Sequence, residues 1–218
     1  SRQSRGLGDV YKRQASSIPL VTLGTFLLWF GWFGFNGFSQ LAMGTFDDVN
    51  AISKIAVNTH LAGAAGTVTG AALTRLIGGK TDIVMMLNGA LAGLVAITAE
   101  PLTPGPITAM IIGSIGAVIM YFGTKMLESY GLDDVVGAIP VHMFAGIFGT
   151  LVVPFTNPDT SFGAQLIGVI SVCIFSFVLS YITFSSLKST IGLRISKAAE
   201  KQGTDKAEVG VTAYSIRD

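Results

Sequence analysis

Charged residues are scarce in this sequence of 218 residues. They make up 12% of the chain, against roughly 25% in an ordinary soluble protein, while hydrophobic residues make up 50%. The formal net charge is only +1, so we expect no basic surface for nucleic acid. The few charges are concentrated at the ends of the chain and in short connections between long apolar runs. This pattern is typical of an all-α polytopic membrane protein.

Cysteine and histidine are nearly absent as well. The single cysteine, Cys173, excludes an intramolecular disulfide. The only two histidines, His60 and His142, are too few for a typical zinc site, and no Cys, Asp or Glu stands at ligand spacing beside them. No phosphate-cradling glycine loop and no Ser/His/Asp arrangement stands out. We therefore expect no metal, no cofactor and no enzyme chemistry.

Six apolar stretches are each long enough to cross a hydrocarbon core of about 30 Å as a helix. They cover residues 19–42, 53–76, 83–99, 106–127, 137–155 and 162–187. Residues 15–193 thus form one membrane domain, and residues 194–218 form a tail. The polar, basic residues 1–14 match nothing that follows, and we expect them to be a non-native or disordered segment.

The charges of the connections predict the orientation of the chain. Basic residues lie in the second and fourth connections and in the tail, whereas the other connections carry acids and no Lys or Arg. Because basic loops stay on the cytoplasmic side, we expect a multi-pass protein of the cell membrane whose C-terminus is cytoplasmic. Small residues recur at spacings that allow close helix packing, as in Gly63, Gly66 and Gly70, in Gly89 and Gly93, and in Ala145 and Gly149.

His142 lies in the middle of the apolar run GAIPVHMFAGIFGTL, residues 137–151. On an α-helix, Ala138, His142 and Gly146 share one face, so open space is expected before the imidazole ring. A polar group at mid-membrane is costly, and a functional role is the first hypothesis for it. The alternative is a core histidine whose ring bonds to a backbone carbonyl. His60 lies nearer the outer surface, and we interpret it as a packing or interfacial residue.

Phe35 and Ser39 lie one helical turn apart on one face of the first apolar stretch. An aromatic face beside a hydroxyl, close to the mouth of a bundle, is able to receive a small cation. Ordinary aromatic anchoring at the membrane interface is the competing interpretation.

Five motifs resemble the ammonium transporter family, which includes the Amt, Mep and Rh proteins. They are WFGFN, AVNTHLAGAAG, NGALAGLVAITA, DDVVGAIPVHMFAGIFGTL and GLR, at residues 32–36, 56–66, 88–99, 133–151 and 192–194. The resemblance covers helices six to eleven of the family's eleven-helix fold, that is, the second inverted repeat and the final helix. It implies a homotrimer in which each subunit has its own hydrophobic pore.

The same resemblance implies roles for individual residues. His142 matches the second of the family's paired pore histidines, and Phe35 matches one of two stacked phenylalanines at the outer entrance. Ser39 matches the hydroxyl of the outer cation site, and Asp134 resembles an acidic residue whose role we interpret as structural. The first pore histidine and the partner phenylalanine belong to the first repeat, which this chain does not contain. The tail sequence AEVGVTAY, residues 207–214, diverges from the family's acidic tail motif.

The expected function is transport of ammonium or ammonia by the full-length parent of this segment. A proton is released at the outer mouth, and ammonia then passes along neutral histidines. Two alternatives remain open: an ammonium-sensing relative that signals through its tail, and a structural membrane module without transport of its own. By resemblance only, the tail suggests a soluble regulatory partner of the PII class.

Overall fold

The computed structural model describes residues 17–132 and 134–212. The segment 1–14, expected to be non-native or disordered, lies outside the described residues. The chain divides into two compact units at residue 167, and each is described here by itself.

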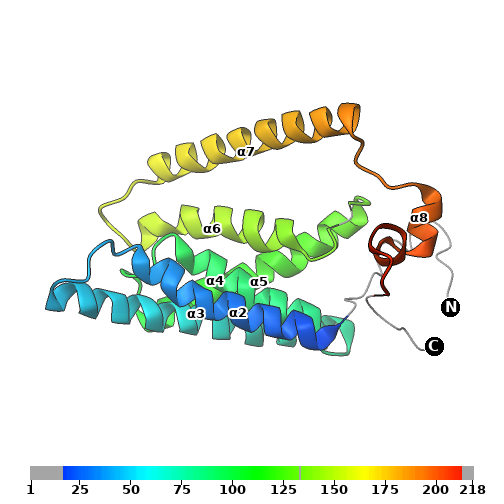
Figure 1. Cartoon of the computed structure of the whole chain (residues 1–218). Helices are drawn as coiled ribbons and strands as arrows, with labels where there is room; N and C mark the ends of the chain where they lie inside the picture. Colours follow the sequence, from blue (N-terminus) through cyan, green and yellow to red (C-terminus); the bar gives the residue numbers. More distant parts are fainter. Residues whose placement is uncertain (1–16, 133, 213–218) are drawn as a thin grey trace. The chain divides into compact units, whose positions relative to one another are not determined.

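Every regular element in the described part of the chain is helical (Figure 1). Each of the six predicted membrane segments coincides with a helix or a helical run, which confirms the all-α fold class. The elements are α2 (Ile18–Phe38), α3 (Phe46–Gly78), α4 (Ile83–Thr98), α5 (Pro106–Ser129), η1 (Ile139–Phe144), α6 (Ala145–Val152), η2 (Val153–Phe155), α7 (Phe162–Thr190), α8 (Lys197–Gln202) and η3 (Asp205–Val209).

Residues in or next to the first turn determine where several of the helices begin. The Thr45 side chain accepts from the Asp48 backbone N–H, and the Asp48 side chain accepts from the Thr45 N–H, which together form a capping box at the start of α3. The Asp82 side chain accepts from the Met85 N–H at the start of α4. Proline in the first turn of α5 fits a position where no backbone donor is needed.

Three of the described helices, α2, α5 and α7, are both long and apolar enough to cross a membrane. The helix α4 and the run Ile139–Phe155 are apolar but shorter. With 16 residues, α4 spans about 24 Å at 1.5 Å per residue. It is therefore shorter than the hydrocarbon core and must be accommodated among its longer neighbours.

Glycine brings α3, α4 and α5 into direct backbone contact. A Cβ atom added at Gly89 of α4 would lie 2.6 Å from the carbonyl oxygen of Gly66 of α3. A Cβ at Gly93 or at Gly113 would collide with the carbonyl of Ala62. We call this contact of Gly66, Gly89, Gly93, Gly113 and Ala62 the glycine interface. It confirms that the small residues serve close helix packing.

The fifth predicted segment is not one regular α-helix. Its first turn is π-helical, because the Ala145 N–H donates to the carbonyl of Pro140, five residues earlier. The regular α-helix on which we expected Ala138, His142 and Gly146 to share a face is therefore absent over residues 139–144. Gly146 faces Val95 of α4, whose Cγ1 atom would lie 3.5 Å from an added Cβ.

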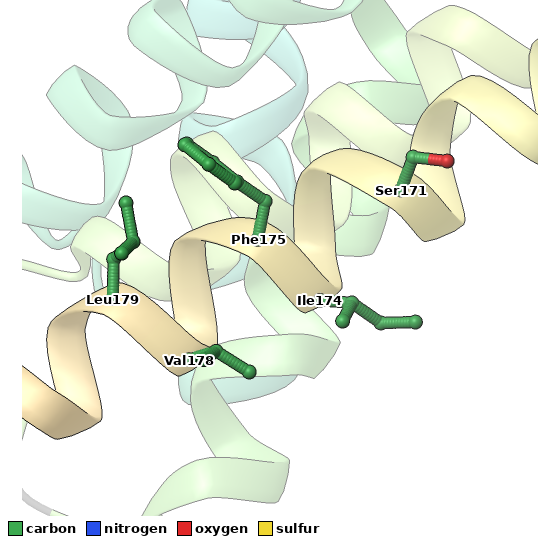
Figure 2. A pocket seen from close by; sticks show the side chains of 5 residues that line it. All are labelled: Ser171, Ile174, Phe175, Val178 and Leu179. Atoms are coloured by element: carbon green, nitrogen blue, oxygen red, sulfur yellow. The ribbon is translucent and has the colours of Figure 1, made fainter.

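The second unit contains most of α7, together with α8 and η3. No residue of α7 is buried. Figure 2 shows a shallow depression on this helix whose lining side chains all come from α7 itself: Ser171, Ile174, Phe175, Val178 and Leu179. One hydroxyl among apolar side chains gives no convergent set of polar groups, so this hollow is no candidate for a substrate site.

Candidate functional site

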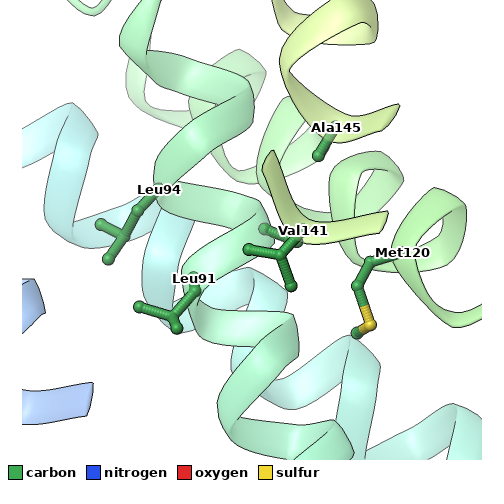
Figure 3. Packing of buried hydrophobic residues seen from close by; sticks show 6 residues of the cluster. Leu91, Leu94, Met120, Val141 and Ala145 are labelled. Atoms are coloured by element: carbon green, nitrogen blue, oxygen red, sulfur yellow. The ribbon is translucent and has the colours of Figure 1, made fainter. Parts of the chain in front are cut away.

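His142 is an exposed residue on a turn whose other side is buried. The neighbouring residues Pro140 and Val141 are buried, and Val141 is 1% exposed. Figure 3 shows Val141 between Leu91 of α4 and Met120 of α5, in one apolar cluster. The core therefore fixes the backbone of the turn, while the imidazole ring faces away from it.

We call residues 136–144 the histidine turn. Two features before His142 determine its shape. Gly137 has φ +74°, a left-handed conformation that glycine adopts without strain. The two carboxylate oxygens of Asp134 accept from the backbone N–H groups of Ala138 and Ile139, at 2.9 and 2.8 Å. Asp134 thus satisfies donors that a helix start leaves without partners.

The imidazole of His142 is oriented by its own turn. Its Nδ1 atom lies 3.3 Å from the carbonyl oxygen of Ala138. Because a carbonyl only accepts, a hydrogen bond here requires a proton on Nδ1. In the neutral ring, Nε2 is then an acceptor.

Phe35 and Ser39 lie at the end of α2, one turn apart. Phe35 is 66% exposed, and Ser39 is exposed as well. The Ser39 hydroxyl donates to the carbonyl of Phe35 at 3.2 Å. Its proton is thereby engaged, while the oxygen keeps lone pairs that can accept from an N–H donor. The pair therefore combines an exposed aromatic ring with a free acceptor.

A contact that the sequence did not predict supports the Phe35 ring. Trp32 packs edge-on against Phe35, with ring centroids 6.2 Å apart. The Trp32 Nε1–H donates to the Thr98 hydroxyl of α4 at 2.7 Å, and this hydroxyl donates to the Leu94 carbonyl at 2.7 Å. Because Trp32 and Thr98 are 66 positions apart, no local pattern reveals the pair. The bond ties the aromatic end of α2 to α4.

The structure does not bring the two candidate regions into direct contact. In the described part of the chain, the backbones of α2 and η1 both lie close to α4 but not to each other. They share one apolar cluster, against which Trp32 packs and in which Val141 is buried. Trp32 beside Phe35, and the turn that carries His142, thus both pack on α4.

The first turn of α3, the helix that follows Ser39, carries an acid, Asp48. The side-chain hydrogen bond from Thr45 and a second one from Gln40 hold the pKa of Asp48 below its usual value. Gln40, whose side chain donates to this carboxylate at 3.2 Å, directly follows Ser39 in the chain. A negative charge near the mouth of such a site favours the approach of cations.

His60 is exposed, as His142 is, but it has aromatic neighbours. Its ring lies against Trp29 and Phe33 of α2, with ring centroids 5.5 and 6.2 Å apart. These contacts fit its interpretation as a packing or interfacial residue. Among the described residues, no three His, Cys, Asp or Glu side chains gather closely enough to hold a metal ion.

Comparisons with known proteins identify the family of the chain. The Ammonium Transporter Family profile matches residues 1–214. Ammonium transporter Amt2 of Archaeoglobus fulgidus is 41% identical over 219 aligned positions, which cover 91% of this chain and 46% of that protein. Ammonium transporter Amt2 of Methanocaldococcus jannaschii is 35% identical, over 91% of this chain and 47% of that protein.

Solved structures with the same fold include a Sensor Amt Protein and Mep2 of Candida albicans. The first has a TM-score of 0.80 at 34% identity, and the alignment covers 88% of this chain and 49% of the Sensor Amt chain. The second has a TM-score of 0.77 at 27% identity, and the alignment covers 90% of this chain and 47% of the Mep2 chain. The chain spans about half the length of the relatives that it matches. With its apolar helices and these matches, this multi-pass membrane chain belongs to the ammonium transporter family.

Proposed function

We propose that this chain is the C-terminal membrane part of a transporter that moves ammonium or ammonia across the cell membrane. The observation that carries the proposal is the exposure of His142, on a hydrogen-bonded turn anchored by the buried Pro140 and Val141, in a chain of the ammonium transporter family. Phe35 and Ser39 contribute to the outer cation site, and Asp134 fixes the start of the turn. The whole transporter acts without a cofactor and without enzyme chemistry.

The proposed mechanism follows from the cost of desolvation. Moving an isolated ion into an apolar medium costs tens of kcal/mol by Born estimates. Release of a proton at the mouth removes most of this cost, and ammonia then crosses as a neutral molecule. Nε2 of a neutral His142 ring accepts a hydrogen bond from ammonia that the apolar wall does not offer.

Assembly and orientation follow the family pattern in this proposal. The exposed ring of His142 requires a second wall, which we assign to the first repeat of the whole protein. The transporter is a homotrimer in the lipid bilayer, and its C-terminal tail is cytoplasmic, as the positive charges of the even connections and of the tail indicate. The tail is the candidate site for a regulatory protein of the PII class.

The test uses the whole transporter, either with its own first half or as a chimera with the first half of the Archaeoglobus relative. In proteoliposomes, we expect ammonium uptake that saturates with concentration. We expect Ser39→Ala to raise the half-saturating concentration, because one hydrogen bond to the cation is lost at a cost of about 1–3 kcal/mol. Uptake no faster than that of empty liposomes, in a correctly folded trimer, would contradict the proposal.

A second candidate function is ammonium sensing. It is favoured by the similarity to the Sensor Amt Protein, which gives a TM-score of 0.80. A sensor binds ammonium without net flux, so the same preparation distinguishes the two functions. Binding that saturates, without uptake into the liposomes, would identify a sensor.

A further inference from the structure

Asn88 of α4 joins that helix to the histidine turn. Its Nδ2 atom donates to the carbonyl of Val136 at 3.0 Å, across 48 positions of sequence. Asn88 is 9% exposed, so an alternative partner from water is hard to reach. If the turn moved away, the nearly buried amide would lose its acceptor and keep the cost of desolvation, so this bond restrains the turn.

Gly137 makes the contact with Asn88 possible. A Cβ atom at Gly137 would lie 2.7 Å from the Asn88 Nδ2 atom, so a larger residue would displace the amide. The left-handed φ of Gly137 then directs the chain into the π-helical segment. The position therefore needs glycine both for its conformation and for its neighbour.

A short series of backbone contacts connects Asn88 to His142. Asn88 holds the carbonyl of Val136, and Val141 N–H donates to the carbonyl of Gly137 at 3.1 Å. Ala138, the next residue, offers its carbonyl to Nδ1 of His142. A displacement at Val136 is thus transmitted to the acceptor that orients the imidazole.

We infer that Asn88 is a positioning residue for His142, which fixes the direction of the ring and the nitrogen that carries the proton. The inference rests on the proposed function, because the ring acts on ammonia there. Asn88 therefore affects the substrate only indirectly, through the position of the histidine turn.

The chain offers a matched control in Asn58 of α3. Asn58 is also buried, and its Nδ2 atom donates to the carbonyls of Pro101 and Pro104 at 2.9 and 2.7 Å. It thus fixes a loop by the same chemistry, but outside the histidine turn. If Asn88 only stabilised the fold, its replacement should affect uptake in the same way as the replacement of Asn58.

The experiment is a double-mutant cycle on uptake per folded transporter. Asn88→Leu keeps the approximate side-chain shape without the donor, and Asn88→Ala replaces it if the leucine variant folds poorly. We expect about a tenfold loss of uptake, less than the roughly hundredfold loss that a misplacement by 1 Å can cause. In a His142→Ala background the same change should reduce uptake by less than about twofold, since coupled sites are not additive.

Asn58→Leu should reduce uptake by the same factor in both backgrounds. Equal losses for Asn88→Leu in both backgrounds, or no loss in either, would overturn the inference. If the transporter without substitutions does not carry ammonium, the proposed function fails, and a second measurement still decides the role of Asn88.

That measurement is the ¹⁵N NMR spectrum of the imidazole nitrogens of this chain in lipid. The chain has two histidines, so a His60→Ala variant assigns the signals of His142. We expect a proton on Nδ1 in the parent chain, a mixture of tautomers in Asn88→Leu, and no change in Asn58→Leu. An unchanged His142 signal in Asn88→Leu would refute the positioning role.

Discussion

The glycine interface and the histidine turn are parts of one packed unit, yet they are built by opposite means. At the glycine interface, helices meet because Gly66 and Gly89 have no side chains, and backbone lies on backbone. At the histidine turn, the side chain of Asp134 holds a backbone segment that helical packing alone leaves irregular. The comparison indicates that stability depends mainly on the first region and the presentation of His142 mainly on the second.

The largest effect on folding is expected at the glycine interface. In Gly66→Ala, the added Cβ atom collides with the carbonyl of Gly89, and neither helix can yield without losing contact elsewhere. We expect a loss of about 1–3 kcal/mol in the free energy of unfolding, as for an overpacked core. Thermal unfolding in detergent measures it.

Gly78→Ala is the control on the same helix, because nothing lies within 4 Å of an added Cβ there. Alanine is the better helix former, so this variant should be neutral or slightly stabilised. Equal destabilisation at both positions would remove the distinction between the glycine interface and the rest of α3.

An intermediate effect is expected for Thr98→Val, which probes a hydrogen bond between helices outside the glycine interface. The Trp32 indole N–H loses its acceptor while the side-chain volume is kept. We expect a destabilisation of about 1 kcal/mol, because the site is only partly buried. A weaker Phe35 contact should also raise the half-saturating ammonium concentration.

Thr25→Val serves as its control. Thr25 is buried, and its hydroxyl donates only to the Val21 carbonyl of its own helix. The substitution therefore removes no contact between helices, and its effect on stability should be smaller. If Thr25→Val proves as costly as Thr98→Val, the Trp32 bond has no special part in holding α2.

The smallest effect is expected at the capping box of α3, outside the two regions compared. The folded pKa of Asp48 lies below the usual 3.8. Its capping contribution is therefore complete above pH 3.8 and is lost as the pH falls through the lowered folded value. Amide hydrogen exchange at the start of α3 should accelerate, beyond its intrinsic pH dependence, only in that acidic range. Asp48→Asn should abolish this pH dependence, and a dependence that persists would assign it to another group.

The helical framework was largely predictable from the sequence. Hydrophobic runs and their polar connections placed all six segments, because hydropathy and caps act locally. The largest difference is at α3, which begins at Phe46, before the predicted start at residue 53. Spacing of small residues also predicted the close packing of Gly66 and Gly93. The patterns that predict these features extend over only a few turns of one helix.

The details of the candidate site depend on contacts that no local pattern contains. The π-helical turn at Pro140 arises where Gly137, Asp134 and the packing of Val141 act together. The partners of Trp32 and Asn88 are 66 and 48 positions away. His142, Phe35, Ser39 and Asp134 could therefore be proposed from the sequence, while the bonds that orient them required the structure.

The most direct test of the central claim compares uptake and stability in His142→Ala. Because the ring is exposed and the turn is anchored by its neighbours, the free energy of unfolding should change by less than about 0.5 kcal/mol. Ammonium uptake per folded transporter should fall at least about tenfold, since the aligned hydrogen-bonding group is lost. Uptake and selectivity unchanged in a fully folded His142→Ala transporter would contradict the account.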